Sequence, residues 1–292
     1  MYVEIDKHSG FCFGVVRAIR VVEQELLKED KLFCIGDIVH NRVEVGRLEK
    51  LGVKVIVHED LERLQGKKVF IRAHGEHPST YEKASRYHID LIDATCPVVL
   101  QLQKKIRRAY EKMKTIGGQI VIFGKPNHPE VNGLWGQTRD EGIIVSSIGD
   151  LDRIDFSRPV SLFVQTTKSE DEFHAIRDEI GRRMRALSPE DPPLFDVTNS
   201  ICREMSSRVP ALQNFVERFE AVLFVSGKKS SNGKFLFSKC REINEKTYFI
   251  SCKDEMKGAW FEGVESVGVC GATSTPMWLM EEIAREVQEM VD

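Results

Sequence analysis

The sequence predicts an α/β fold of three similar parallel-sheet domains in a pseudo-threefold arrangement. Short apolar runs alternate with segments of helical periodicity along the chain, which is typical of parallel sheets covered by helices. The same junction, an apolar run followed by a cysteine and then a helix, occurs at Cys12, Cys96 and Cys202. The predicted domains are 13–96, 97–202, and 203–292 completed by the N-terminal segment 1–12.

In the first repeat, apolar residues at helical spacing predict a helix from Cys12 to Leu26. Short apolar runs that end at glycine or polar residues predict strands. The strands expected after this helix are 32–35, 53–57, 69–71 and 89–92, with helices at 43–51 and 79–87.

The later repeats follow the same order, with a helix directly after Cys96 and after Cys202. The second repeat is expected to contain strands 119–123, 143–145, 160–164 and 193–196 and a helix at 170–184. The third is expected to contain strands 221–225, 248–250 and 267–269 and a last helix at 277–290. We expect residues 2–5 to supply its missing fourth strand.

The spacing of polar residues also repeats. Each cysteine is followed after 24, 28 or 25 residues by a loop glycine, and four residues later by a polar side chain. These side chains are His40, His128 and Ser231, and the third strands end at His74, Thr166 and Ser274. Because parallel sheets bind ligands beyond the carboxyl ends of their strands, these residues are candidates for one site.

Composition restricts the class of protein. Of 292 residues, 41% are hydrophobic, which is enough for a packed core and disfavours disorder. A net charge of −3 disfavours a nucleic-acid partner. No segment approaches the roughly 20 apolar residues of a membrane span, and no signal peptide is recognisable. We therefore expect a cytoplasmic protein without a membrane partner.

The cysteines predict a metal site rather than disulfides, since seven is an odd number in a long chain without a signal peptide. A helix N-terminus is expected to lower the pKa of each junction thiol and favour the metal-binding thiolate. Three cysteines suit either a Cys₃His zinc site or a cubane iron–sulfur cluster with one open iron. Their wide spacing disfavours a zinc finger. The others are expected to be small buried apolar residues: Cys34, Cys240, Cys252 and Cys270.

Several hydrogen-bond donors suggest an anion pocket. They are His40, His74, His128, Ser230, Ser231, Asn232 and Ser274. The segment 227–233 resembles a phosphate-holding loop before a helix, although a plain surface turn is about as consistent with it. Glu130 is the one acid at its place in the repeat, which makes it a candidate proton donor that Thr166 or Thr167 positions.

These motifs resemble the 4-hydroxy-3-methylbut-2-enyl diphosphate reductase family. The matching stretches are Gly10–Val15, Val39–Arg42, Ala73–Gly75, Asp93–Pro97, His128–Val131, Gln165–Thr167, Ile201–Cys202, Ser230–Asn232 and Ser274–Pro276. They occur in order over nearly the whole chain.

The resemblance implies three α/β domains around a central [4Fe-4S] iron–sulfur cluster held by Cys12, Cys96 and Cys202. It implies that the open iron meets the substrate hydroxyl, and that Glu130 with Thr166 delivers protons. The residues implied to hold the diphosphate are His40, His74, His128, Ser230, Ser231, Asn232 and Ser274. The implied reaction is reductive dehydroxylation to isopentenyl and dimethylallyl diphosphate, the last step of the non-mevalonate isoprenoid pathway. Electrons are expected from ferredoxin or flavodoxin, and the protein is expected to be a monomer or weak homodimer.

Two other classes remain as alternatives. A non-catalytic iron–sulfur protein for electron transfer or oxygen sensing is disfavoured, because such a protein would use four cysteine ligands and no diphosphate pocket. A zinc-stabilised binding module is the second alternative, which iron and sulfide analysis would distinguish.

Overall fold

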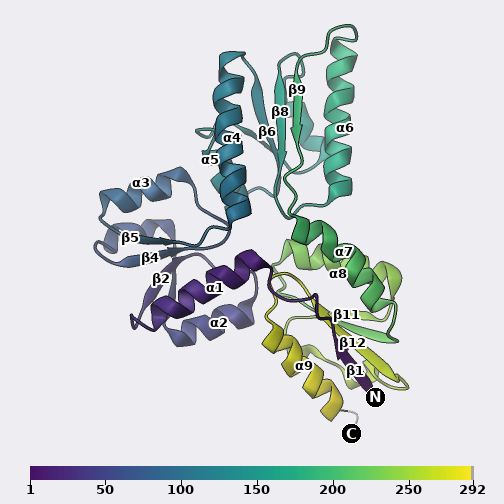
Figure 1. The fold of residues 1–292 in the computed structure, drawn as a ribbon. Coiled ribbons are helices and arrows are strands. Elements are labelled where there is room, and N and C mark those ends of the chain that lie inside the picture. Colours follow the sequence, from purple (N-terminus) through teal and green to yellow (C-terminus); the bar gives the residue numbers. More distant parts are fainter. Residues whose placement is uncertain (291–292) are drawn as a thin grey trace. The chain divides into compact units, whose positions relative to one another are not determined.

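The computed structural model describes residues 1–290, and the chain divides into two compact units (Figure 1). Unit 1 comprises Met1–Ile56 and the chain from Ser207 onward, and unit 2 comprises Val57–Ser206. Together the two units contain three four-stranded parallel sheets. The predicted α/β fold class is therefore confirmed.

In unit 1 the first strand of the chain completes a sheet formed by its C-terminal part. The strand order is β1 (Tyr2–Ile5), β12 (Ser266–Gly271), β10 (Ala221–Val225) and β11 (Thr247–Ile250). Val3 lies opposite Val267 in the parallel pair of β1 and β12. Residues 2–5 thus supply the fourth strand of the third repeat, as the sequence predicts.

Alternation along β10 forms two hydrophobic cores in this unit, since successive strand residues point to opposite faces. Leu223 and Val225 pack in one core with α9 (Met277–Glu289). Val222 and Phe224 pack in the other with the C-terminal part of α7 (Arg203–Val216) and α8 (Ser231–Ile243). The sheet is therefore covered by helices on both faces.

Unit 2 contains an equivalent sheet with the order β7 (Ile143–Val145), β6 (Gln119–Phe123), β8 (Val160–Val164) and β9 (Phe195–Thr198). Ile120 and Ile122 pack against α4 (Pro97–Thr115) and α5 (Pro129–Gly136). Val121 and Phe123 pack against α6 (Glu170–Leu187) on the other face. Figure 1 shows α4 and α6 on either side of this sheet.

The remaining sheet has the order β3 (Val53–Ile56), β2 (Leu32–Ile35), β4 (Lys68–Ile71) and β5 (Asp90–Asp93). Its helices are α1 (Phe13–Leu26), α2 (Arg42–Leu51) and α3 (Pro78–Arg86). Short 3₁₀ helices complete the chain: η1 (His58–Arg63), η2 (Ile148–Arg153), η3 (Lys253–Glu255) and η4 (Gly258–Trp260).

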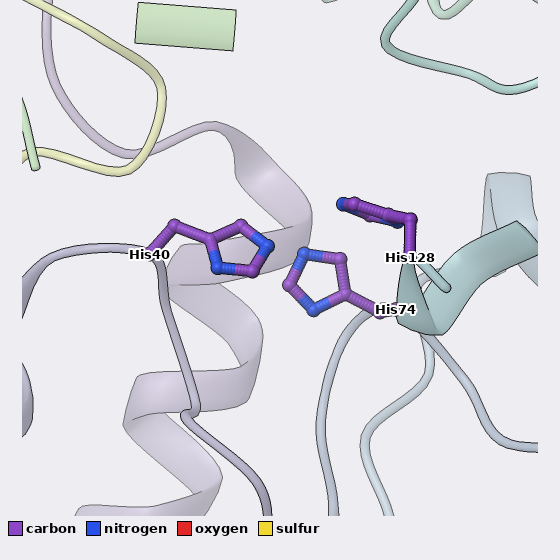
Figure 2. Close-up of side chains that lie close together, drawn as sticks. All are labelled: His40, His74 and His128. Atoms are coloured by element: carbon purple, nitrogen blue, oxygen red, sulfur yellow. The ribbon is translucent and has the colours of Figure 1, made fainter. Parts of the chain in front are cut away.

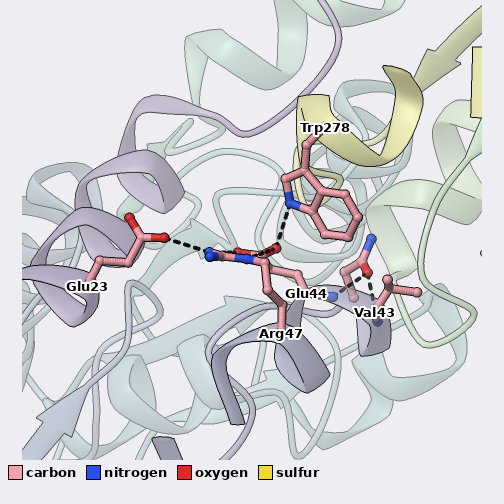
Figure 3. A network of polar contacts seen from close by, with 6 residues as sticks. Glu23, Val43, Glu44, Arg47 and Trp278 are labelled. Carbon is pink, nitrogen blue, oxygen red and sulfur yellow. Dashed lines mark hydrogen bonds and ion pairs between the residues drawn. The ribbon is translucent and has the colours of Figure 1, made fainter. Parts of the chain in front are cut away.

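A buried carboxylate joins α1, α2 and α9 within unit 1 (Figure 3). Glu44 is fully buried, and its carboxylate accepts hydrogen bonds from Arg47 at 2.6 and 2.9 Å and from the indole Nε1 of Trp278 at 3.0 Å. Arg47 also donates to Glu23 at 2.7 Å. Asn41 caps α2 by accepting from the backbone N–H of Glu44. The first turn of α2, which begins two residues after His40, is therefore held both by its cap and by the contact of Glu44 with Trp278.

Two expectations about elements need correction. The helix α5 after His128 is not among the predicted elements, because Gly133 and Gly136 reduce helix propensity there. The strand before Cys202 begins at Phe195 rather than at Pro193, since proline has no N–H to donate to the neighbouring strand β8. Within residues 1–290, none of the helices combines the length and apolar character required to cross a bilayer.

Candidate functional site

The three repeated cysteines share one backbone environment. Each lies immediately before the first residue of α1, α4 or α7. Its backbone N–H donates to a carbonyl just beyond a neighbouring strand: Cys12 to Thr273 at 3.2 Å, Cys96 to Ala73 at 2.9 Å and Cys202 to Thr166 at 2.9 Å. The first bond lies within unit 1 and the other two within unit 2. The three cysteines, which the spacing predicts to be equivalent, thus make an equivalent backbone hydrogen bond in each repeat.

The thiols of Cys96 and Cys202 interact electrostatically in unit 2. Burial raises the pKa of Cys202, and a neighbouring Cys96 thiolate raises it further. The backbone N–H groups of Glu204 and Met205 act in the opposite direction but do not outweigh burial. The expectation that a helix N-terminus lowers the pKa of each junction thiol is therefore wrong for Cys202. A bound cation would favour both thiolates, because it removes their mutual repulsion.

The other cysteines are mostly core residues, as expected. Cys34, Cys240 and Cys270 are buried, and Cys240 and Cys270 pack in the same core. Cys252 differs because it is only partly buried: it follows the end of β11 and precedes the short helix η3. The expectation of a buried residue is wrong at this position.

Glu130 has the properties of a proton donor. It lies in the first turn of α5 with 1% of its surface exposed, and burial raises the pKa of its carboxyl to about 7. The backbone N–H of Thr166 donates to Glu130 Oε1 at 2.8 Å, and the Thr166 hydroxyl also favours the ionised form. Near neutral pH this carboxyl is therefore divided between its protonated and ionised forms.

His128 and His74 lie beside each other in unit 2. His128 caps α5, where its Nδ1 accepts from the backbone N–H of Glu130 at 3.2 Å. The rings of His74 and His128 are nearly perpendicular, with centroids 5.4 Å apart (Figure 2). Two imidazoles thus lie near the buried carboxyl at the strand ends of this unit. His40, also labelled in Figure 2, belongs to unit 1 and follows β2.

Unit 1 contains the second group of candidate donors. Ser230 caps α8 by accepting from the N–H of Gly233 at 3.0 Å, and the Ser274 hydroxyl lies 3.4 Å from Ser230 Oγ. Asn232 donates to Thr273 at 2.6 Å. Ser231 is the first residue of α8. The predicted phosphate-holding loop does lead into a helix, whose N-terminus favours an anion.

A tight backbone approach connects this loop to the segment after β2. A Cβ atom on Gly227 would lie 2.0 Å from the carbonyl oxygen of His40, so only glycine fits there. The adjacent cavity has a volume of about 480 Å³, and its lining includes the basic residues Arg42, Lys228 and Lys229. This arrangement gives the His40 side of unit 1 an excess of cationic groups.

Gln165 is a further candidate residue, which lies in the Gln165–Thr167 motif but is not among the residues predicted from sequence. Its side-chain oxygen accepts from the backbone N–H of Lys125 at 3.0 Å, and its Nε2 donates to Thr167 at 3.1 Å. This bridge connects the loop after β6 to the loop after β8. It therefore helps to hold Thr166 opposite Glu130.

Comparisons with known proteins agree over nearly the whole chain. The family model described as LytB protein matches residues 3–288. The 4-hydroxy-3-methylbut-2-enyl diphosphate reductase of Parabacteroides distasonis is 54% identical over 288 residues, covering 99% of this chain and 98% of the relative. The protein of the same name from Bacteroides fragilis is 47% identical over 289 residues, with coverage of 99% and 98%.

Two solved structures have the same fold. A structure of (E)-4-hydroxy-3-methyl-but-2-enyl diphosphate reductase, described as the terminal enzyme of the non-mevalonate pathway, has a TM-score of 0.73 and 33% identity, covering 99% of this chain and 100% of the other. The E-1-hydroxy-2-methyl-but-2-enyl-4-diphosphate reductase of Plasmodium falciparum has a TM-score of 0.83 and 25% identity, with coverage of 98% and 87%.

Proposed function

The chain belongs to the LytB protein family, and we propose that it is a 4-hydroxy-3-methylbut-2-enyl diphosphate reductase. The overall reaction takes up two electrons and two protons. The hydroxyl group leaves as water, and the five-carbon skeleton becomes isopentenyl or dimethylallyl diphosphate. The reaction therefore requires a source of electrons, a site for the diphosphate and a proton donor beside the reacting carbons.

We assign Cys12, Cys96 and Cys202 as the ligands of a [4Fe-4S] cluster. The donor set fits such a group, since thiolates are its ligands and the interaction of Cys96 with Cys202 favours a shared cation. When bound, the cluster would supply electrons and an open iron with Lewis acidity toward the substrate hydroxyl.

The diphosphate is assigned to a set of imidazole, hydroxyl and amide donors. They are His40, His74, His128, Ser230, Ser231, Asn232 and Ser274. Hydrogen bonds to phosphate oxygens are charge-assisted and strong, and the N-terminus of α8 adds a favourable dipole. These residues would therefore hold the diphosphate end of the substrate.

The main support for this proposal is Glu130. Its buried carboxyl has a pKa of about 7 and is therefore suited to proton donation near neutral pH. Thr166 positions it through the 2.8 Å backbone hydrogen bond. When Glu130 has given up its proton, the Thr166 N–H and hydroxyl stabilise the resulting carboxylate. Because the site is buried, bulk water competes little with this transfer.

Further assignments follow from the proposed activity. The electron donor is ferredoxin or flavodoxin, and the protein acts in the cytoplasm as a monomer or weak homodimer. Its sequence repeats correspond to domains 13–96, 97–202, and 203–292 with 1–12. Neither nucleic acid nor a membrane takes part in the reaction.

The test is anaerobic oxidation of a reduced viologen dye, with and without 4-hydroxy-3-methylbut-2-enyl diphosphate. We expect substrate-dependent oxidation that yields both five-carbon diphosphates. If protein with an intact [4Fe-4S] cluster oxidises no dye in the presence of substrate, the reductase function is wrong and an electron-transfer or sensor role replaces it.

A further inference from the structure

The loop that carries His74 is a tight turn after β4. The backbone N–H of Gly75 donates to the carbonyl of Arg72 at 3.0 Å, and Gly75 has a φ of +73°. A Cβ atom on Gly75 would lie 2.8 Å from Nε2 of Gln103. Glycine is therefore needed for both the conformation and the close approach of α4. His74 lies inside this turn, next to Gly75.

Two buried charged residues flank the turn. Arg72 is 8% exposed and Glu76 is 4% exposed, and Arg72 Nη2 lies 3.6 Å from Glu76 Oε1. The other carboxylate oxygen, Oε2, lies 2.8 Å from Nε2 of His58 on η1. The Thr80 hydroxyl donates to the same oxygen at 3.4 Å. The carboxylate thus has partners just after β4, on η1 and on α3.

Burying the charges of Arg72 and Glu76 costs free energy of folding. Buried charges lose their hydration, and a buried ion pair often stabilises a protein no more than apolar residues of similar volume. Paired charges do, however, restrict geometry: the hydrogen bonds of His58 and Thr80 fix the direction of the Glu76 carboxylate, and the ion pair with Arg72 limits its distance from the start of the turn. The set Arg72, Glu76 and His58, here called the turn clasp, therefore restricts the conformation of residues 72–76.

The turn clasp is also adjacent to the helix that carries Glu130. A Cβ atom on Gly133 of α5 would lie 3.2 Å from the carbonyl oxygen of Glu76 and 3.0 Å from Gln103 Nε2. The backbone of Glu76 therefore packs directly on α5. The position of Glu76 fixes the His74 turn relative to the helix that His128 caps and that carries Glu130.

We propose that Glu76, held by Arg72 and His58, is a positioning residue that fixes the His74 imidazole for the substrate's diphosphate. This inference rests on the proposed function. Because a diphosphate is bound equally in the ground state and the transition state, loosening His74 raises KM and leaves kcat nearly unchanged. Loss of packing alone would lower the thermal midpoint without this separation of the two constants.

The experiment compares His58→Ala, His58→Gln and Glu76→Gln in the anaerobic holoenzyme. We expect KM for the substrate to rise about tenfold in His58→Ala and Glu76→Gln, with kcat within about twofold of wild type. His58→Gln should restore a KM near wild type, because its amide N–H can donate to the Glu76 carboxylate. Calorimetry with inorganic pyrophosphate should show the same order of affinities.

The matched control is Glu59→Ala, which removes an exposed carboxylate from the same short helix and should change neither constant. His58 is only partly buried, so His58→Ala remains informative if Glu76→Gln fails to fold. Unchanged KM and pyrophosphate affinity in His58→Ala, with an active wild type, would overturn the inference alone. A wild type without substrate turnover would instead contradict the proposed function.

Discussion

Replacing Glu130 with glutamine should remove most turnover and also change how stability depends on pH. The variant keeps the shape of the side chain and the oxygen that accepts from Thr166 at 2.8 Å. It loses the ability to donate a carboxyl proton. Wild-type turnover should fall as pH rises through about 7, because the protonated form of Glu130 is lost there.

The expected stability difference follows from the two pKa values of this carboxyl. In the unfolded chain Glu130 ionises near pH 4.5, whereas burial raises its pKa to about 7 in the folded protein. Between these pH values the folded state retains a proton that the unfolded state has released, so stability falls as pH rises. The loss is complete above the folded pKa and amounts to about 3 kcal/mol.

Denaturant unfolding of wild type and Glu130→Gln at pH 5 and pH 8 measures this effect. Glutamine does not ionise, so the variant should gain stability relative to wild type by up to about 3 kcal/mol on going from pH 5 to pH 8. Glu82→Gln, at an exposed position, is the control and should follow wild type. Parallel pH profiles of Glu130→Gln and wild type would refute the reasoning.

Two further substitutions test the site, each with a matched control. Cys96→Ser should lose the iron–sulfur cluster while Cys252→Ser keeps it, as measured by iron and sulfide content; an intact cluster in Cys96→Ser would contradict the ligand assignment. Gly227→Ala should destabilise the protein by about 3 kcal/mol, because its methyl group would lie 2.0 Å from the His40 carbonyl oxygen. A Cβ atom on Gly258 would have no atom within 4 Å, so Gly258→Ala should unfold at the wild-type midpoint. Equal losses of stability in the two alanine variants would show that the close approach of Gly227 to His40 does not exclude a side chain.

Much of the fold was predictable because its signals are local. Apolar runs and helical spacing predict the order of strands and helices, and the repeat of cysteine junctions predicts that residues 2–5 complete the last sheet. The helix α5 was missed because its eight residues include Gly133 and Gly136, which weaken the helical pattern. Pro129 at its first position and Glu130 in its first turn were the available signals.

The site was only partly predictable. Its polar residues follow strands at repeated spacing, so their positions could be predicted from sequence. The burial of Glu130, which raises its pKa, depends on packing among distant segments. The same holds for Glu76, whose carboxylate meets a histidine 18 residues away. The repeat marks Glu130 as a candidate but not as buried, and Glu76 has no sequence signal of its own, so neither environment follows from composition or periodicity.

The pairing of β1 with β12 has a consequence for protein synthesis. The strand Tyr2–Ile5 pairs with Ser266–Gly271, a segment that is synthesised much later. Unit 2 is a continuous stretch of chain and can fold while translation proceeds, whereas unit 1 must wait for its C-terminal part. Cys12 therefore acquires its hydrogen bond to Thr273 only after that later segment has been synthesised. The proposed cluster, with Cys12 as a ligand, would accordingly be completed after unit 2 has been synthesised.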